Sequence, residues 1–340
     1  MPEKPTTDST AMALDSATLA AIPPASRTLK VRSFREAALI AIIIAIFVAM
    51  TFASPYFLTW ANMRAMLLSF AIDGIVVVGM TILLIVGGID LSVGSVVCLS
   101  MAVAGYLFLA GVNPWIASLV GIGAAALVGV CIAFCVTVVG LTYFIASLAF
   151  MVIARGACMV ITQGTPLSLY SLPESFKFVG QGVVGGVPFV ILIFVFVAIV
   201  FDILMRRAVA FRRIFYTGSN EQAAAYSGIS VSKVKFAVTV LCSTLAGLAG
   251  IIYMARFGAA TPTFGVGMEL NVIAAAVIGG ASLEGGVGSV LGAVLGIALL
   301  STVSSSLILL NVSVYWQDMI RGCILLGAVT IDYLLHRSRA

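Results

Sequence analysis

The chain has 340 residues, of which 62% are hydrophobic and only 9% charged, and its mean hydropathy is +1.20. A soluble domain carries about 25% charged residues, so the composition excludes an ordinary soluble domain and indicates a polytopic membrane protein. The single histidine, His336, lies near the C-terminus, and all six cysteines lie within apolar segments. We therefore expect neither a metal centre nor a disulfide framework.

Residues 1–35 are rich in Ser, Thr, Ala and Pro, and they lack the early apolar run that marks a signal peptide. We expect these residues to form a disordered cytoplasmic tail. The predicted membrane domain covers 36–335, and a short cytoplasmic tail covers 336–340.

Ten apolar segments fill the membrane domain: 36–54, 70–87, 91–111, 115–138, 143–163, 187–206, 233–255, 269–281, 287–308 and 317–335. Nine of them are close to the roughly 20 residues that cross a bilayer. Segment 269–281 would reach only about 20 Å at the helical rise per residue, so we expect a half-helix or a segment buried among others. Alternatively, 269–308 forms one broken hairpin with the same topology. The predicted fold class is an all-α polytopic membrane protein.

The positions of the basic residues predict the orientation. With the N-terminus inside and ten crossings, most of the 18 Lys and Arg residues lie on the inside. The positive-inside rule then places both termini in the cytoplasm. Because topology accounts for the net charge of +5, this charge does not indicate a nucleic-acid partner.

A polar, glycine-rich stretch interrupts the apolar sequence at 87–95, which reads Gly-Gly-Ile-Asp-Leu-Ser-Val-Gly-Ser. Irregular backbone at membrane depth must be buried in protein or face water, because lipid leaves its polar groups unpaired. Asp90 directly precedes the apolar run 91–111, where its side chain can cap a helix. The alternative is a direct substrate or coupling role. The candidate residues of this stretch are Gly87, Gly88, Asp90, Ser92, Gly94 and Ser95.

Other charged residues lie within or at the ends of apolar segments: Asp73, Arg155, Glu269, Asp318 and Arg321. Asp318 and Arg321 are spaced to neutralise each other on a helix. Arg155 has no local partner, so it either reaches another segment or lines a water path.

The sequence contains neither a Gly-x-x-x-x-Gly-Lys-Ser/Thr loop nor the chain of acidic residues and histidines typical of proton relays. We therefore expect no catalysis and no nucleotide hydrolysis of that class in this chain.

Two long loops remain. The predicted outer loop, 164–186, is more apolar than a solvated connector, which leaves open a docked partner, a lid, or packing on the outer rim. The predicted inner loop, 207–232, contains a helix signature in which Ser219 or Asn220 is the cap, Glu221 and the alanines favour helix, and Gly228 ends it. The small exposed residues of this helix favour docking into a groove of another protein over contact with lipid.

These motifs resemble a known family. Stretch 87–95 is similar to the signature of the ribose-type permeases, the membrane subunits of bacterial ATP-binding-cassette (ABC) importers for simple sugars. The resemblance covers roughly 36–335. It extends to Phe57-Leu58-Thr59 with Asn62, Gly79-Met80-Thr81, Arg155-Gly156, Gly267-Met268-Glu269-Leu270 and Val277-Ile278-Gly279-Gly280. Leu141-Thr142-Tyr143 departs from the family, which commonly has a proline there, and the spacing from Glu221 to Gly228 matches the general importer motif only loosely.

The resemblance implies a fold similar to the vitamin-B12 importer permease, with two such subunits, either identical or related, forming the pathway by alternating access in the inner membrane. It further implies a periplasmic sugar-binding protein and a cytoplasmic ATPase that binds ATP and Mg²⁺. The coupling helix to the ATPase would comprise Gly218, Ser219, Asn220, Glu221, Ala223, Ala224 and Gly228. Arg155, Glu269 and Asn271 join the residues of 87–95 as pathway or signature candidates.

Two functions of other classes compete with this interpretation. A self-sufficient secondary carrier of a small polar solute requires ion-coupling carboxylates at mid-depth, for which only Asp90 qualifies. A membrane-embedded enzyme requires a nucleophile or a metal cluster, and the sequence offers neither. The resemblance favours the sugar-importer permease over both.

Overall fold

The computed structural model describes residues 25–337, and these form a bundle of helices. Each of the ten predicted apolar segments contains a helix. These are α2 (Ala25–Ala53), α3 (Trp60–Ile85), α4 (Val93–Leu109), α5 (Pro114–Phe134), α6 (Tyr143–Thr162), α8 (Phe189–Arg207), α11 (Val231–Phe257), α12 (Met268–Ile278), α13 (Val290–Leu309) and α14 (Val314–Arg337). A π-helical turn, Cys135–Val139, extends α5. In the described part of the chain, 7 helices are long and apolar enough to span a membrane, whereas α4 and α12 are shorter.

Two helices begin ten or more residues earlier than predicted. Helix α2 starts at Ala25, so residues 25–35 are helical, and the rest of the predicted disordered tail lies outside the described residues. Helix α3 starts at Trp60 because Thr59 caps it, accepting the Asn62 backbone N–H. The short segment 269–281 corresponds to α12, which has 11 residues and is largely buried.

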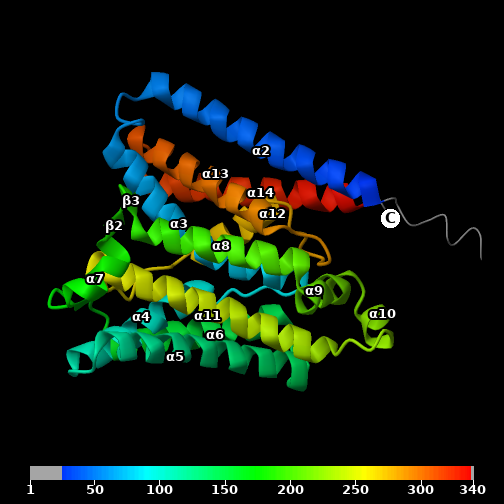
Figure 1. The fold of residues 1–340 in the computed structure, drawn as a ribbon, viewed down its shortest axis with the longest axis horizontal. Helices are drawn as coiled ribbons and strands as arrows, with labels where there is room; N and C mark the ends of the chain where they lie inside the picture. The colour runs from blue at the N-terminus through cyan, green and yellow to red at the C-terminus, as the bar shows by residue number, and fades with distance from the viewer. Residues whose placement is uncertain (1–24, 338–340) are drawn as a thin grey trace, which may run out of the picture.

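Helices α3 and α11 form the centre of the bundle (Figure 1). Helix α11 packs on α3, α4 and α5, while α13 packs on α2, α3 and α12. The span of α3 is 78% buried, against 11% for α2. Small residues allow this density. A Cβ on Gly250 would lie 2.3 Å from the Val97 carbonyl oxygen, and one on Gly296 would lie 2.0 Å from that of Ala275. Close backbone approach of this kind is typical of packed membrane helices.

The two ends of the bundle carry different elements. At one end, called the α7 end, lie α7 (Glu174–Gln181) and two small antiparallel sheets. The sheets pair β1 (Leu167–Ser168) with β4 (Ala259–Ala260), and β2 (Val183–Val184) with β3 (Val187–Pro188). At the other, called the α10 end, lie α9 (Val209–Ser219) and α10 (Glu221–Tyr226). The first turn of α2 and the last turn of α14 also lie at the α10 end (Figure 1).

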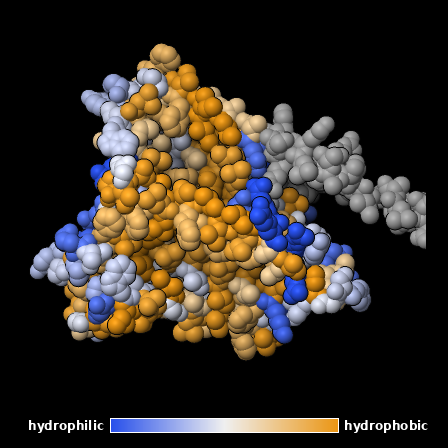
Figure 2. Space-filling view, in the orientation of Figure 1, coloured by the Kyte–Doolittle hydropathy of each residue, from blue (hydrophilic) through white to orange (hydrophobic). Residues whose placement is uncertain are grey.

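The surface between these ends is apolar. Figure 2 shows hydrophobic residues over the middle of the visible face and hydrophilic residues gathered toward its two sides. This distribution fits a multi-pass membrane protein, because an apolar band must contact lipid while the polar ends contact water.

Several apolar residues of the predicted outer loop pack against the bundle. Leu169, Leu172 and Phe176 are buried in a cluster with residues of α4 and α11, whereas the Tyr170 side chain is 81% exposed. Packing on the rim therefore accounts for much of this loop's apolar character.

The expectation of no disulfide is wrong for one pair of cysteines. Cys98 of α4 and Cys158 of α6 form a disulfide, with their Cα atoms 6.4 Å apart. The pair joins neighbouring helices from positions 60 residues apart in sequence, and apolar periodicity alone does not reveal which helices face each other. Cys131, Cys135, Cys242 and Cys323 are free.

Candidate functional site

The stretch 87–95 forms a buried turn between α3 and α4. The Asp90 side chain is fully buried, and its Oδ1 accepts hydrogen bonds from the Ser92 backbone N–H at 2.7 Å and the Ser92 hydroxyl at 2.6 Å. The Ser243 hydroxyl of α11 donates to Asp90 Oδ2 at 3.5 Å. Helix α4 begins at Val93, not at Leu91, and Ser92 occupies its N-cap position. Asp90 therefore fixes the turn that precedes the helix.

The start of α4 touches the loop that leads into α12. A Cβ on Gly94 would lie 2.0 Å from the Gly265 carbonyl oxygen and 2.8 Å from Glu269 Oε2. Gly265 has a φ of +76°, a conformation that glycine adopts without strain. Ser95, the next residue along α4, is buried. The backbones of Gly94 and Gly265 are thus in direct contact, and Glu269 in the first turn of α12 lies beside them.

Arg155 also holds this loop. Its Nη1 donates to the carbonyl oxygens of Pro262 and Phe264, at 2.8 Å each. Arg155 therefore reaches from α6 to the α11–α12 loop, and Glu269 contributes the opposite charge that acts on it. The structure brings together Gly94, Arg155 and Glu269, which lie far apart in the sequence.

Four glycines join three segments at the α10 end, and we call Gly87, Gly218, Gly285 and Gly286 the glycine junction. A Cβ on Gly218 would lie 1.8 Å from the Ile85 carbonyl oxygen, and one on Gly285 would lie 3.1 Å from the Gly87 nitrogen. The Gly286 N–H donates to the Ile85 carbonyl oxygen at 2.8 Å. The last turn of α9 is therefore in direct backbone contact with the end of α3 and with the loop between α12 and α13. The neighbouring candidate Gly88 lies against Leu83 and Tyr143 instead.

Helix α10 projects from this junction. Asn220, rather than Ser219, is its N-cap, because Asn220 Oδ1 accepts the Ala223 N–H at 2.9 Å while the Ser219 hydroxyl donates to the Phe215 carbonyl oxygen. Glu221 forms an ion pair with Lys235 of α11. Ala223 is exposed and Ala224 is buried. Gly228, with a φ of +80°, follows the helix, so α10 is a short capped helix whose outer face is free.

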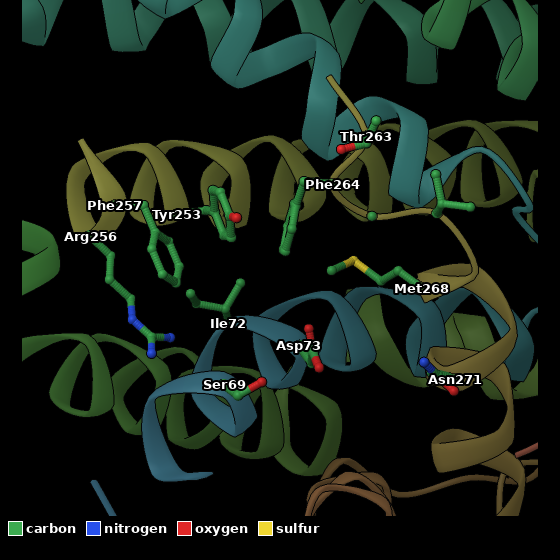
Figure 3. A pocket seen from close by; sticks show the side chains of 12 residues that line it. Ser69, Ile72, Asp73, Tyr253, Arg256, Phe257, Thr263, Phe264, Met268 and Asn271 are labelled. Atoms are coloured by element: carbon green, nitrogen blue, oxygen red, sulfur yellow. The ribbon is translucent and has the colours of Figure 1, made fainter. Parts of the chain in front are cut away.

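A cavity of about 400 Å³ lies near the α7 end, between α3, α11 and the loop before α12 (Figure 3). Its wall is formed by Ser69, Ile72, Asp73, Tyr253, Arg256, Phe257, Thr263, Phe264, Gly265, Val266, Met268 and Asn271. The rings of Tyr253 and Phe264 are stacked with centroids 3.6 Å apart. Figure 3 shows these rings and the Asp73 carboxylate facing the same space.

A second cavity, of about 340 Å³, shares Ser69, Asp73 and Asn271 with the first. Its wall adds Asn62 of α3, Ser301, Ser304 and Ser305 of α13, and Arg321 of α14, among others. Asn271 is the one predicted pathway residue that lines both cavities. Asp73 was not among the predicted site residues, although a carboxylate inside an apolar segment is a signal that could have identified it.

Comparisons with known proteins assign the family. Residues 62–329 match the family model described as "Branched-chain amino acid transport system / permease component". The chain belongs to this family. It is 35% identical to the ribose import permease of Bacillus subtilis over 82% of this chain and 87% of that protein. It is 37% identical to the ribose import permease of Escherichia coli K12 over 87% and 93%, respectively.

A third relative extends the comparison to another sugar. The chain is 32% identical to the L-arabinose ABC transporter permease of Azospirillum brasilense, over 88% of each chain. No solved structure matches the chain. These findings confirm the resemblance to the ribose-type permeases, and the chain is an ABC transporter permease for sugars.

Proposed function

We propose that this chain is the transmembrane subunit of an ATP-driven importer that carries a simple sugar, a pentose, hexose or related polyol, across the bacterial inner membrane. The observation that carries the proposal is the similarity to ribose and L-arabinose permeases over more than four fifths of the chain. The proposed fold is similar to the vitamin-B12 importer permease, with ten crossings and alternating access to the pathway.

The proposed orientation places the α10 end in the cytoplasm. Arg206, Arg207, Arg212, Arg213 and Lys233 are exposed there, and basic loops face the cytoplasm. Because α2 begins and α14 ends at the α10 end, both termini are cytoplasmic in this orientation. The α7 end then faces the periplasm.

Helix α10 is the proposed docking element for the ATPase. The exposed Ala223 and the 91% exposed Tyr226 side chain offer a narrow ridge that fits a groove in another protein. Gly218 lies in the last turn of α9, directly before α10, and contacts the end of α3 and the loop before α13. A displacement of α10 by the ATPase would therefore move two membrane helices through direct backbone contact.

The remaining proposed partners follow from the same assembly. A second permease subunit, identical or related, completes the pathway. A periplasmic sugar-binding protein docks at the α7 end, where Tyr170 and Phe178 are exposed. ATP and Mg²⁺ bind to the ATPase, with no cofactor in this chain.

Co-purification of the chain with its ATPase in lipid, with and without sugar-loaded binding protein, tests this function. We expect the loaded binding protein to stimulate ATP hydrolysis. Ala223→Trp should abolish this stimulation because it adds bulk to the docking ridge, whereas Ala223→Ser should preserve it. Sugar uptake by the chain alone in vesicles, without association with the ATPase, would instead make the protein a secondary carrier.

A further inference from the structure

The exposure of Asp73 differs from that of its neighbours on α3. Ala71, Ile72 and Gly74 are buried in the bundle, whereas Asp73 is partly exposed and lines both cavities. An ionisable residue within a membrane helix is costly and usually marks a substrate or ion pathway. Among the described residues, we find no hydrogen bond to the Asp73 carboxylate. Its oxygens are therefore available to a solute in the cavity.

Two arginines lie near enough to compensate the charge of this carboxylate, and the cavity remains open. Arg321 and Arg256 are the positive charges that act on Asp73, and each lines one of the two cavities. Arg256 also lies over the Phe257 ring, 4.7 Å from its centroid. The carboxylate accepts hydrogen bonds and the Arg256 guanidinium, which lines the first cavity, donates them. Together they can bond a neutral solute that carries several hydroxyl groups.

The wall opposite Asp73 is aromatic. Tyr253 stacks on Phe264 and also lies 4.5 Å from Phe257, measured between ring centroids. A sugar ring has C–H groups on its faces and hydroxyls around its edge, so it binds well between an aromatic surface and polar side chains. Cavities of this size fall within the range of about 300–1,000 Å³ that holds small ligands.

The cavity lies where a solute would arrive from the periplasm. Helix α7 covers the last turn of α11: a Cβ on Gly180 would lie 2.1 Å from the Arg256 nitrogen, and Gln181 Nε2 donates to the Arg256 carbonyl oxygen at 3.0 Å. Arg256 is thus fixed directly beneath the surface proposed for the binding protein. Across Asp73, the serine-lined second cavity extends the polar path along α13.

We propose that Ser69, Asp73 and Asn271, facing the Tyr253–Phe264 stack, form a binding site for one monosaccharide ring within a single permease subunit. The site receives the sugar after the periplasmic protein releases it. This inference rests on the proposed function and deepens it, because it gives the membrane subunit its own sugar contacts. An amino acid is the competing ligand, since Asp73 could pair with its ammonium group and an arginine with its carboxylate.

Equilibrium binding to the permease–ATPase complex in lipid discs, without the binding protein, tests this site. The probes are D-ribose, D-allose, L-arabinose and L-leucine, each radiolabelled. We expect binding of at least one sugar and none of leucine. Asp73→Asn and Phe264→Ala should each weaken sugar binding at least about tenfold, because hydrogen bonds to a charged group and ring contacts are lost. Asp202→Asn is the matched control, because Asp202 pairs with Arg206 on α8, away from the cavity.

Uptake by the complete importer separates failure of this site from failure of the proposed function. Under the proposal, Asp73→Asn raises KM for the sugar while ATP hydrolysis is still stimulated by the loaded binding protein. Normal import with unchanged sugar affinity in both cavity variants would overturn the site and leave the importer intact. Leucine binding that depends on Asp73 would also overturn it. A wild-type complex that imports no pentose, hexose or polyol would overturn the proposed function itself.

Discussion

Two aspartates, one within α3 and one in the turn that follows it, lie in different environments. Beyond the C-terminal end of α3, the buried Asp90 carboxylate accepts hydrogen bonds from Ser92 and Ser243, and the glycine junction brings backbones into direct contact. Near the middle of α3, Asp73 lines two cavities. The two carboxylates therefore differ in their surroundings. Asp90 maintains a turn, whereas Asp73 lies at the wall of open volume.

This contrast fits the separate tasks of an importer subunit. A segment that transmits movement must be tightly packed, because a loose contact absorbs displacement instead of passing it on. A segment that binds a solute needs open volume and polar groups without permanent partners. The following predictions test whether the region around Asp90 and the glycine junction is structural and the region around Asp73 functional.

The largest expected effect is at the glycine junction. In Gly218→Val, the added Cβ would lie 1.8 Å from the Ile85 carbonyl oxygen, so the backbones must separate at a cost of more than about 3 kcal/mol. We expect little folded protein, measured as yield of the monodisperse complex. Gly156→Val is the control, since no atom lies within 4 Å of a Cβ there. Normal yield of Gly218→Val would show that the junction is not tightly packed.

A smaller loss of stability is expected at Asp90. Asp90→Ala leaves the buried N–H and hydroxyl of Ser92 without their acceptor, which should lower the free energy of unfolding by about 2–4 kcal/mol. Asp90→Asn retains an oxygen that can accept from Ser92, and its amide can donate to the Ser243 hydroxyl, so assembly and transport should largely persist. Thermal unfolding and sugar uptake measure the two effects. Loss of transport by well-assembled Asp90→Asn would instead show that the charge of Asp90 is functional.

The sequence predicts the helices of this protein well because hydrocarbon imposes a simple requirement on each one. All ten apolar segments correspond to helices, including the short α12, since a membrane segment must satisfy its own backbone hydrogen bonds. Helix α4 begins at Val93, just inside the apolar run 91–111, because Asp90 and Ser92 close the turn before it through a local hydrogen bond that hydropathy does not register.

Contacts between segments are less accessible to sequence reasoning. The Cys98–Cys158 disulfide and the bonds from Arg155 to the α11–α12 loop join residues 60 or more positions apart. Asp73 was noted as a charge in an apolar segment, but its cavity depends on side chains from α11, α12 and α13. No single helix pattern shows that these residues face one another.

At Asp73 we expect a change in transport with almost no change in stability. Asp73→Asn removes a charge from a cavity wall without altering side-chain size, so the unfolding temperature should stay within a few degrees of wild type, corresponding to less than about 1 kcal/mol. KM for the sugar should rise. Unfolding followed by tryptophan fluorescence and uptake kinetics measure both. A large loss of stability would make Asp73 a structural residue and remove its contrast with Asp90.

The smallest effect is expected at the Glu221–Lys235 ion pair, which tethers α10 to α11 at an exposed site where Glu221 is 52% exposed. Exposed pairs contribute about 0.2–1 kcal/mol because water screens them and two long side chains must be ordered. Glu221→Gln should therefore leave yield, unfolding temperature and stimulated ATP hydrolysis close to wild type. Since the Asn220 cap and the glycine junction remain in this variant, α10 should keep its position. A severe loss of ATPase stimulation would mean that the ion pair, rather than the backbone contact at Gly218, transmits the movement of the ATPase to the membrane helices.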